Sequence, residues 1–535
     1  MSEQFEMVAK TFQGLEGVLS DELKALGATD VLQGNRMVSF KGDNEILYKA
    51  NFCCRTALRI LKPFYKFRSN DADDLYEQIK SYDWEQLMTP DKTFQIDSTV
   101  YSENFRHSRF VTYRVKDAIA DHFMEKYQKR PSIRLTAPDL KFDVHISNDE
   151  VTISLDSSGD PLYKRGWRVA QTDAPINEVL AAGIIKLSGW DGNSNFVDPM
   201  CGSGTFLIEA ALIAANINPG VYRKDYAFQR WTDYDKELFE SIYNDDSQER
   251  DFKFKIYGAD IAPKAVAITR ANVKSAGMGK LIEVENKGIQ DWDSAPEKGV
   301  LVSNPPYGER IAVEDMEGLY TTIGDKLKNV FRGYDAWIIG YDKELFGKIG
   351  LKASLHYPLL NGDLECQLRE YVIFDGSYDD LRRQGGSIKN EDFRASDENR
   401  KSNHRKFVET FDKPGGSHSD KPKRRFGRDS RSRDDDQRKP RRFGSFDKRR
   451  DDDGNHNERR RSFGDKKPFG DRKPKFGEAA ERPRHRDSDY ERRHRAPRLG
   501  KEAERPIVTG GRRNSWKRNN INESNNQNNN NDNEQ

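Results

Sequence analysis

Residues 195–217 read NFVDPMCGSGTFLIEAALIAANI, and this stretch decides the predicted fold of the chain. The short apolar run NFVDPM has the composition of a buried strand, and a Gly-rich turn and an apolar helical segment follow it. A strand–turn–helix unit presents bare backbone N–H groups at the start of its helix, where they can hold a ligand. The stretch therefore predicts a binding site at the carboxyl end of the strand.

Strand and helix patterns continue to alternate around this unit, over residues 174–375. IYGADI is followed by the helical pattern PKAVAITRANVKSAG, and LIEVEN, GVLVSNPP and DAWIIGY add further strands. Strands separated by helices form βαβ units, so the sequence predicts an α/β fold with a mostly parallel, doubly wound, Rossmann-like sheet. Ligands of such sheets bind at the carboxyl ends of the strands.

The region before residue 160 has a different, α+β pattern. FEMVAKTF, MVSFKG, RTALRILKPFYKF, FQIDSTVY, FDVHIS and VTISLD predict strands, while LEGVLSDELKALG, DADDLYEQIKSYDW and a segment from Ser108 predict helices. The region contains no Gly-rich phosphate loop and no catalytic cluster. We therefore predict that it is a binding module.

Charge is distributed unevenly along the chain. Its length of 535 residues suggests about three domains, at ~150 residues per domain. Residues 1–385 hold 48 Lys+Arg and 60 Asp+Glu, a net charge of −12, whereas residues 386–535 hold 42 and 28, a net charge of +14. The basic segment has almost no aliphatic residues, so we predict a disordered tail. An acidic body with a basic tail indicates a nucleic-acid or membrane-surface partner.

The tail repeats Phe in basic settings such as RRFG, which fits weak RNA contact, with a merely solvated tail as the alternative. The four cysteines form no CxxC pair, and neither a signal peptide nor a membrane-spanning apolar run is seen. We therefore expect a soluble cytoplasmic protein without a metal site or membrane partner.

The Gly-rich turn excludes two common nucleotide loops. A P-loop needs a Lys that is missing here, and a GxGxxG loop needs a small residue where Leu207 stands. An acid that ends a strand before a GxG turn fits a ligand with a cationic amine and no pyrophosphate, such as S-adenosylmethionine. The predicted cofactor contacts in this stretch are Asp198, Pro199, Cys201, Gly202, Gly204 and Thr205.

Two later strand ends extend the predicted cofactor site. Asp260 and Ile261 end IYGADI, and a carboxylate there can accept hydrogen bonds from ribose hydroxyls, although Asp260 could instead cap the following helix. The turn at 288–291 offers Gln290 and Asp291 to an adenine edge.

The heptapeptide NPPYGER, residues 304–310, closes the strand GVLVS. Pro305 and Pro306 remove two N–H donors, so nearby carbonyls stay available beside the Asn304 side chain. Such a corner can accept both hydrogens of a planar exocyclic amine, and Tyr307 can stack on the base. These four residues are the predicted catalytic group, which needs no strong general base.

DPMCGSGT and NPPYGER together resemble the THUMP-containing class I RNA methyltransferases, and most closely the large-subunit (23S) rRNA guanine-N2 methyltransferases. The resemblance covers roughly residues 5–375. It implies a ferredoxin-like subdomain over 1–60, a THUMP domain over 61–160, a class I methyltransferase domain over 161–380 and a tail over 386–535.

The resemblance also implies roles for individual residues. Asp198, Gly202 and Gly204 would hold the methionine end of S-adenosylmethionine, Asp260 the ribose, and residues 304–307 the N2 amine of guanine. Relatives often have an Asp near Gly288, where this chain offers Gln290 and Asp291. Some relatives carry a second methyltransferase domain, whereas only a basic tail follows here, so we expect one activity.

The implied substrate is RNA, either large-subunit rRNA or its assembling particle. The candidate RNA contacts are Arg109, Arg114, Lys116, Arg165, Arg168 and Arg310. Three alternatives stay open: a tRNA guanine-N2 enzyme, a methyltransferase for adenine-N6 in DNA or protein glutamine, and a non-catalytic assembly factor.

Overall fold

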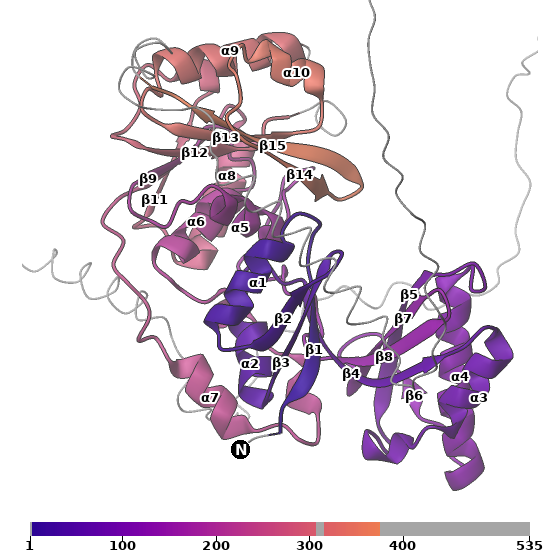
Figure 1. Cartoon of the computed structure of the whole chain (residues 1–535). Coiled ribbons are helices and arrows are strands. Elements are labelled where there is room, and N and C mark those ends of the chain that lie inside the picture. The colour runs from indigo at the N-terminus through magenta and orange to yellow at the C-terminus, as the bar shows by residue number, and fades with distance from the viewer. Residues whose placement is uncertain (1–2, 307–314, 375–535) are drawn as a thin grey trace, which may run out of the picture. The chain divides into compact units, whose positions relative to one another are not determined.

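The computed structural model describes residues 3–306 and 315–374, which form two β-sheets with flanking helices (Figure 1). Tyr307, Arg310 and the predicted tail, residues 386–535, lie outside the described residues. Among the described residues, no helix combines the length and apolar character that crossing a membrane requires.

The first sheet has eight strands in the order β2-β3-β1-β4-β8-β7-β5-β6. Its strands are β1 (Phe5–Lys10), β2 (Thr29–Gln33), β3 (Met37–Gly42), β4 (Arg59–Arg68), β5 (Thr93–Tyr101), β6 (Ser132–Ile133), β7 (Leu140–Ser147) and β8 (Glu150–Asp156). The long strand β4 pairs with β1 on one side and β8 on the other. The sheet is therefore continuous across residues 60 and 61, where we predict a domain boundary.

The structure describes four helices in this region, and the sequence predicts all of them except the second. They are α1 (Glu16–Ala25), α2 (Asn44–Cys53), α3 (Ala72–Ser81) and α4 (Ser108–Tyr127), with a 3-10 turn η1 (Trp84–Gln86). Asp71 caps α3, since its carboxylate accepts from the amides of Asp73 and Asp74. Leu75 and Ile79 form its buried face. The sequence pattern did not indicate α2 or β2.

The second sheet has seven strands in the order β11-β10-β9-β12-β13-β15-β14. Its strands are β9 (Asn195–Asp198), β10 (Ile256–Asp260), β11 (Ile282–Asn286), β12 (Gly299–Ser303), β13 (Asp335–Gly340), β14 (His356–Asn361) and β15 (Leu364–Val372). The first five in the order are parallel, β15 runs antiparallel to β13, and the edge strand β14 pairs antiparallel with β15. The predicted doubly wound, mostly parallel sheet is confirmed.

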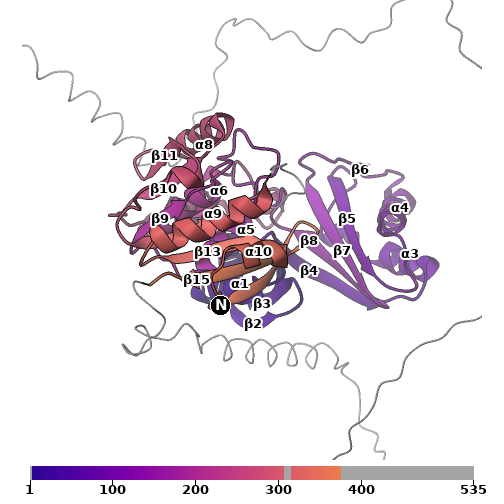
Figure 2. The ribbon, with the colours of Figure 1, turned by 90° about the horizontal axis from the view of Figure 1, so that it is seen from above.

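Helices cover both faces of this sheet, and each face has its own core (Figure 2). The helices are α5 (Glu178–Leu187), α6 (Thr205–Ala214), α8 (Pro263–Ala276), α9 (Met316–Asn329) and α10 (Lys343–Lys348). Neighbouring residues of one strand enter opposite cores: Phe196 packs with α5, α6 and α8, whereas Val197 packs with α9 and α10. A strand buried on both faces explains why the adjacent residues Phe196 and Val197 are both apolar.

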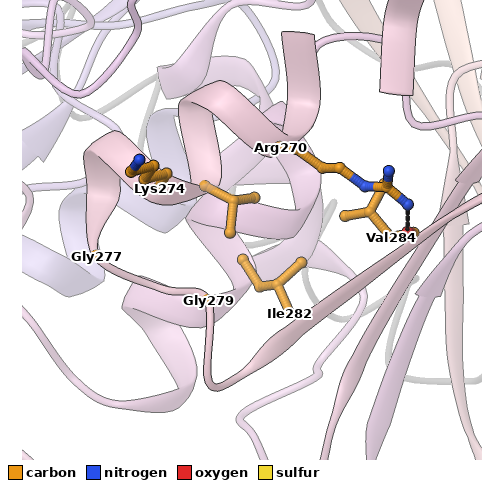
Figure 3. Close-up of a pocket in the computed structure, with 7 residues that line it drawn as sticks. Arg270, Lys274, Gly277, Gly279, Ile282 and Val284 are labelled. Carbon is orange, nitrogen blue, oxygen red and sulfur yellow. Dashed lines mark hydrogen bonds between the residues drawn. The ribbon is translucent and has the colours of Figure 1, made fainter. Parts of the chain in front are cut away.

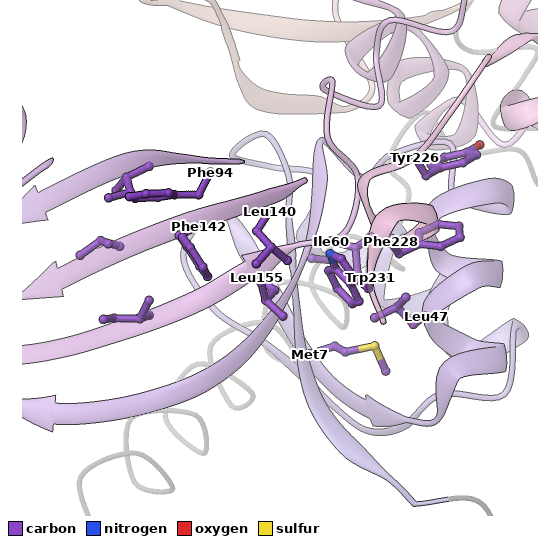
Figure 4. Packing of buried hydrophobic residues seen from close by; sticks show 14 of the residues in the cluster. Met7, Leu47, Ile60, Phe94, Leu140, Phe142, Leu155, Tyr226, Phe228 and Trp231 are labelled. Atoms are coloured by element: carbon purple, nitrogen blue, oxygen red, sulfur yellow. The ribbon is translucent and has the colours of Figure 1, made fainter. Parts of the chain in front are cut away.

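An excursion between α6 and β10 packs against the first sheet. It contains η2 (Pro219–Tyr222), η3 (Ala227–Arg230) and α7 (Lys236–Asn244). Phe228 and Trp231 lie in the same core as Leu47 and Ile60 (Figure 4), and the Phe228 ring stacks on Tyr48 with centroids 4.5 Å apart. The α+β region therefore shares its core with a segment far along the chain.

Candidate active site

Four parallel strands place their carboxyl ends side by side. Strand β9 ends at Asp198, β10 at Asp260, β11 at Asn286 and β12 at Ser303. Their registers pair Gly258 with Asp198 and Asp260 with Asn286. The polar residues that end these apolar strands thus share one edge of the sheet, as the sequence predicts.

The Gly-rich turn after β9 needs both glycines. Gly204 has φ +78°, and a Cβ there would lie 2.7 Å from the Thr269 methyl carbon, which is closer than real Cβ contacts come. Gly202 has φ +55°, and its Cβ would meet only the Thr172 hydroxyl, at 3.8 Å. The backbone at Gly202 is therefore open to a ligand, whereas Gly204 is closed against α8.

Side chains of α8 hold the turn from behind. The Thr269 hydroxyl donates to the Gly202 carbonyl at 2.7 Å, and the Asn272 amide donates to the Ser203 carbonyl at 2.9 Å. Both side chains are fully buried. Sequence reasoning missed them, although two polar residues within the apolar stripe of a predicted amphipathic helix are a usable signal.

Asp198 is buried beneath this turn, with 1 % of its surface exposed. Its Oδ1 accepts a hydrogen bond from the Ser303 hydroxyl at 2.8 Å and from the Met200 amide at 3.2 Å. Burial raises the pKa of Asp198 to about 7, and the nearby charge of Asp260 adds to this. A buried carboxylate is stable near neutral pH when a cation lies beside it, which fits the predicted amine ligand.

Asp260 bridges the neighbouring strand end and the turn. Its Oδ2 accepts from the Gly202 amide at 2.9 Å, and its Oδ1 accepts from the Ala262 amide at 2.9 Å. The second contact closes a turn before α8 and is not a helix cap, because the N-cap residue of α8 is Ala262 and no side chain caps the helix. Ile261, the next residue, is 65 % exposed and presents an apolar surface beside this carboxylate.

The turn at 288–291 forms η4 (Ile289–Asp291). The Asp291 carboxylate accepts from the Gly288 amide at 2.9 Å and from the Gln290 side chain at 3.2 Å. Asp291 therefore stabilises the turn itself, and the side chains of Gln290 and Asp291 are both exposed next to it.

Asn304 follows β12 directly. Its side-chain Oδ1 is buried and accepts no hydrogen bond from any residue that the structure describes. A buried acceptor without a partner is costly, so such an atom in a native site indicates a missing donor. Pro305 is buried next to it, and neither proline can supply an N–H.

Two of the candidate RNA contacts are engaged within the protein instead: Arg165 is buried and Arg168 is partly buried. Arg165 is 2 % exposed; it pairs with Glu209 at 3.4 Å and donates to the Arg55 carbonyl at 2.6 Å. Arg168 pairs with Glu178 at 2.7 Å and donates to the Thr205 hydroxyl at 2.8 Å. Their burial and their partners argue against the predicted RNA contacts, and Arg168 supports the start of α6.

The other three candidates that the structure describes lie on α4. Arg114 pairs with Asp73 of α3 at 2.5 Å, which ties the two helices together. Arg109 is exposed and forms no ion pair with another described residue, and Lys116 pairs only with its neighbour Asp117. Phe110 and Tyr113, 54 % and 56 % exposed, lie along the same side of the helix.

A hollow of about 370 Å³ lies elsewhere, between α8 and the edge strand β11 (Figure 3). Val273, Ile282 and Val284 form its apolar lining, and Arg270 donates to the Val284 carbonyl at 2.7 Å. It is separate from the strand ends described above. Within the described part of the chain, no three His, Cys, Asp or Glu side chains are grouped so that they could hold a metal ion.

Known families match three consecutive parts of the chain. A ferredoxin-like domain matches residues 6–61, the THUMP domain matches residues 69–156, and the family described as "RMKL-like, methyltransferase domain" matches residues 165–370.

Among solved structures, "SMU.472, a putative methyltransferase complexed with SAH" is 31% identical with a TM-score of 0.63, covering 70% of this chain and 100% of that one. A structure described as a "predicted N6-adenine-specific DNA methylase" from Listeria monocytogenes is also 31% identical, with a TM-score of 0.62, covering 69% of this chain and 97% of that one.

Two relatives show the same similarity along the sequence. "Ribosomal RNA large subunit methyltransferase K/L" of Syntrophotalea carbinolica is 37% identical over 386 residues, which are 70% of this chain and 54% of the relative. The chain spans about half the length of this relative and of other curated relatives of the same name. "Putative RNA methyltransferase slr0064" of Synechocystis is 37% identical over 369 residues, which are 68% of this chain and 96% of the relative. The chain therefore belongs to the family of THUMP-containing methyltransferases with an RMKL-like methyltransferase domain.

Proposed function

We propose that the protein transfers a methyl group from S-adenosylmethionine to the exocyclic N2 amine of a guanine in large-subunit rRNA. The observation that carries this proposal is the buried Asn304 Oδ1 directly after β12, an acceptor that no donor among the described residues satisfies. An exocyclic base amine is a donor of the required kind. An rRNA substrate would also place the protein in the cytoplasm.

The residues at the strand ends fit S-adenosylmethionine. The open backbone at Gly202 admits a ligand close to the turn, and the buried Asp198 carboxylate suits the cationic amine of the methionine end. Asp260 offers its carboxylate to ribose hydroxyls, and the exposed Ile261 offers an apolar face to adenine. Pro199, Cys201 and Thr205 shape the turn, and the 288–291 turn with Gln290 and Asp291 would border the adenine.

When bound, S-adenosylmethionine supplies an electrophilic methyl group on a sulfonium sulfur. Asn304 Oδ1 would accept one hydrogen of the amine, and a carbonyl beside Pro305 and Pro306 the other. Accepting these hydrogens raises electron density on nitrogen and fixes its direction, and holding the amine in line lowers the barrier further. Tyr307 would stack on the base. The amine proton passes to solvent after transfer, so no strong base is needed.

We propose that RNA lies against α4. Arg109 and Lys116 would contact phosphates, and the exposed rings of Phe110 and Tyr113 would stack on unpaired bases. Arg310 and the tail remain proposed RNA contacts.

A second candidate substrate is the N6 amine of adenine, because the Listeria relative is described as a predicted N6-adenine-specific DNA methylase. Both amines would offer their two hydrogens to the same acceptors, the Asn304 Oδ1 and a neighbouring carbonyl. The THUMP match favours RNA over DNA.

The test is methyl transfer from labelled S-adenosylmethionine to unmodified large-subunit rRNA and to unmodified tRNA in parallel. We expect label in the rRNA. Label in tRNA alone would show that tRNA is the substrate, and the proposed mechanism of methyl transfer would still apply. No label in either RNA, or in assembling ribosomal particles, would favour a non-catalytic assembly factor.

A further inference from the structure

Ser303 lies between the two halves of the candidate site and has no assigned role. It is the last residue of β12 and is fully buried. Its hydroxyl donates to Asp198 Oδ1 at 2.8 Å, and its carbonyl carbon is bonded to Asn304. One side chain thus joins the cofactor side of the site to the acceptor side.

We propose that Ser303 is a positioning residue that keeps the Asp198 carboxylate oriented and ionised for the cationic amine of S-adenosylmethionine. The inference rests on the proposed function only in taking that cofactor as the ligand. The Ser303 hydroxyl and the Met200 amide both donate hydrogen bonds to Asp198 Oδ1. This arrangement leaves Oδ2 for the ammonium group.

The surroundings of Asp198 explain why this hydroxyl matters. Burial and the neighbouring carboxylate of Asp260 disfavour the ionised form, while the Ser303 hydroxyl and the Met200 amide favour it. The thiol of Cys201 also lies in this environment, and burial raises its pKa well above the usual range, so it stays neutral. Of the groups around Asp198, the Ser303 hydroxyl therefore lowers the pKa of this carboxyl the most.

The test is calorimetry of S-adenosylmethionine binding to Ser303→Ala and to the wild-type protein between pH 5.5 and 8. A hydrogen bond to a charged group is worth roughly one pKa unit or more. The affinity of the variant should then fall only about twofold below wild type at pH 8, but about tenfold at pH 6, because less Asp198 is ionised there. The ligand's own amino group titrates near pH 8 in both proteins, so it cancels in the ratio.

Two further variants complete the design. Ser303→Cys keeps a weak donor of similar size, so its loss at pH 6 should be intermediate. Ser354→Ala is the matched control, since the Ser354 hydroxyl donates to the Glu370 carboxylate at 2.6 Å far from the strand ends. Its affinity should match wild type at every pH.

A loss of the same size at pH 6 and pH 8 would overturn the proposal and leave Ser303 a packing role. Unchanged affinity at both pH values would also overturn it. Because the readout is binding without RNA, either result is distinguishable from failure of the proposed rRNA activity, in which the wild-type protein would bind cofactor and transfer no methyl group.

Discussion

Replacing Gly204 by Ala tests whether the Gly-rich turn has to pack against α8. The left-handed backbone at φ +78° costs an L-residue roughly 1–2 kcal/mol. The new Cβ would also lie 2.7 Å from the Thr269 methyl carbon, and overpacking of this kind costs roughly 1–3 kcal/mol. We expect Gly204→Ala to destabilise the protein by about 2–5 kcal/mol in total.

Gly277→Ala is the matched control. Gly277 has φ +71°, and a Cβ there has nothing within 4 Å. The Gly277→Ala variant therefore has the backbone strain without the steric clash, and we expect its free energy of unfolding to fall by only about 1–2 kcal/mol. Adding Thr269→Ser to Gly204→Ala removes the clashing methyl group and keeps the hydroxyl that donates to the Gly202 carbonyl.

The assay is denaturant unfolding of all four proteins together with S-adenosylmethionine affinity by calorimetry. Gly204→Ala should lose stability and affinity, the double variant should regain part of both, and Gly277→Ala should keep wild-type affinity. Equal losses in Gly204→Ala and Gly277→Ala, with no gain from Thr269→Ser, would refute the packing argument.

Four further substitutions test the remaining roles. Asn304→Ala should lower methyl transfer at least a hundredfold while cofactor affinity stays within twofold, and calorimetry that showed lost affinity would move Asn304 to the cofactor site. Asp198→Asn should raise the unfolding free energy at pH 8 by up to ~4 kcal/mol but not below pH 4. The reason is that the pKa of Asp198 is about 7 in the folded protein against 3.8 for a free carboxyl, so the wild-type protein loses stability as pH rises through 7 and this buried group ionises. The asparagine variant does not ionise and keeps that stability. Equal effects of the substitution at both pH values would contradict this reasoning. Arg165→Met should lower the free energy of unfolding by about 3–5 kcal/mol, because Glu209 stays buried without its partner. Arg109→Ala should weaken RNA binding without destabilising the fold. Melting curves and salt-dependent RNA titrations test both, and a stable Arg165→Met together with a destabilised Arg109→Ala would contradict the assignment.

Much of the site was predictable because polar residues end apolar strands. Asp198, Asp260 and Asn304 each follow a run of apolar residues, and parallel strands bring their carboxyl ends together. Thr269 and Asn272 were not predicted because their roles depend on how α8 is rotated against the turn. That rotation is a property of packing rather than of local pattern.

Arg165 shows why charge alone misleads. A sequence contains no sign that its guanidinium meets Glu209, 44 residues away, within the core. The continuous first sheet was equally inaccessible, since β4 pairs along both edges and the pattern of one strand does not reveal its two neighbours. The excursion over 219–244 packs on a distant core for the same reason.

The most direct test of the central claim is the identity of the methylated nucleoside. Unmodified large-subunit rRNA would be incubated with labelled S-adenosylmethionine and either wild-type protein or Asn304→Ala, then digested to nucleosides for mass spectrometry. The account predicts N2-methylguanosine with wild-type protein and almost none with the variant. N6-methyladenosine as the labelled nucleoside, or undiminished N2-methylguanosine with Asn304→Ala, would contradict it.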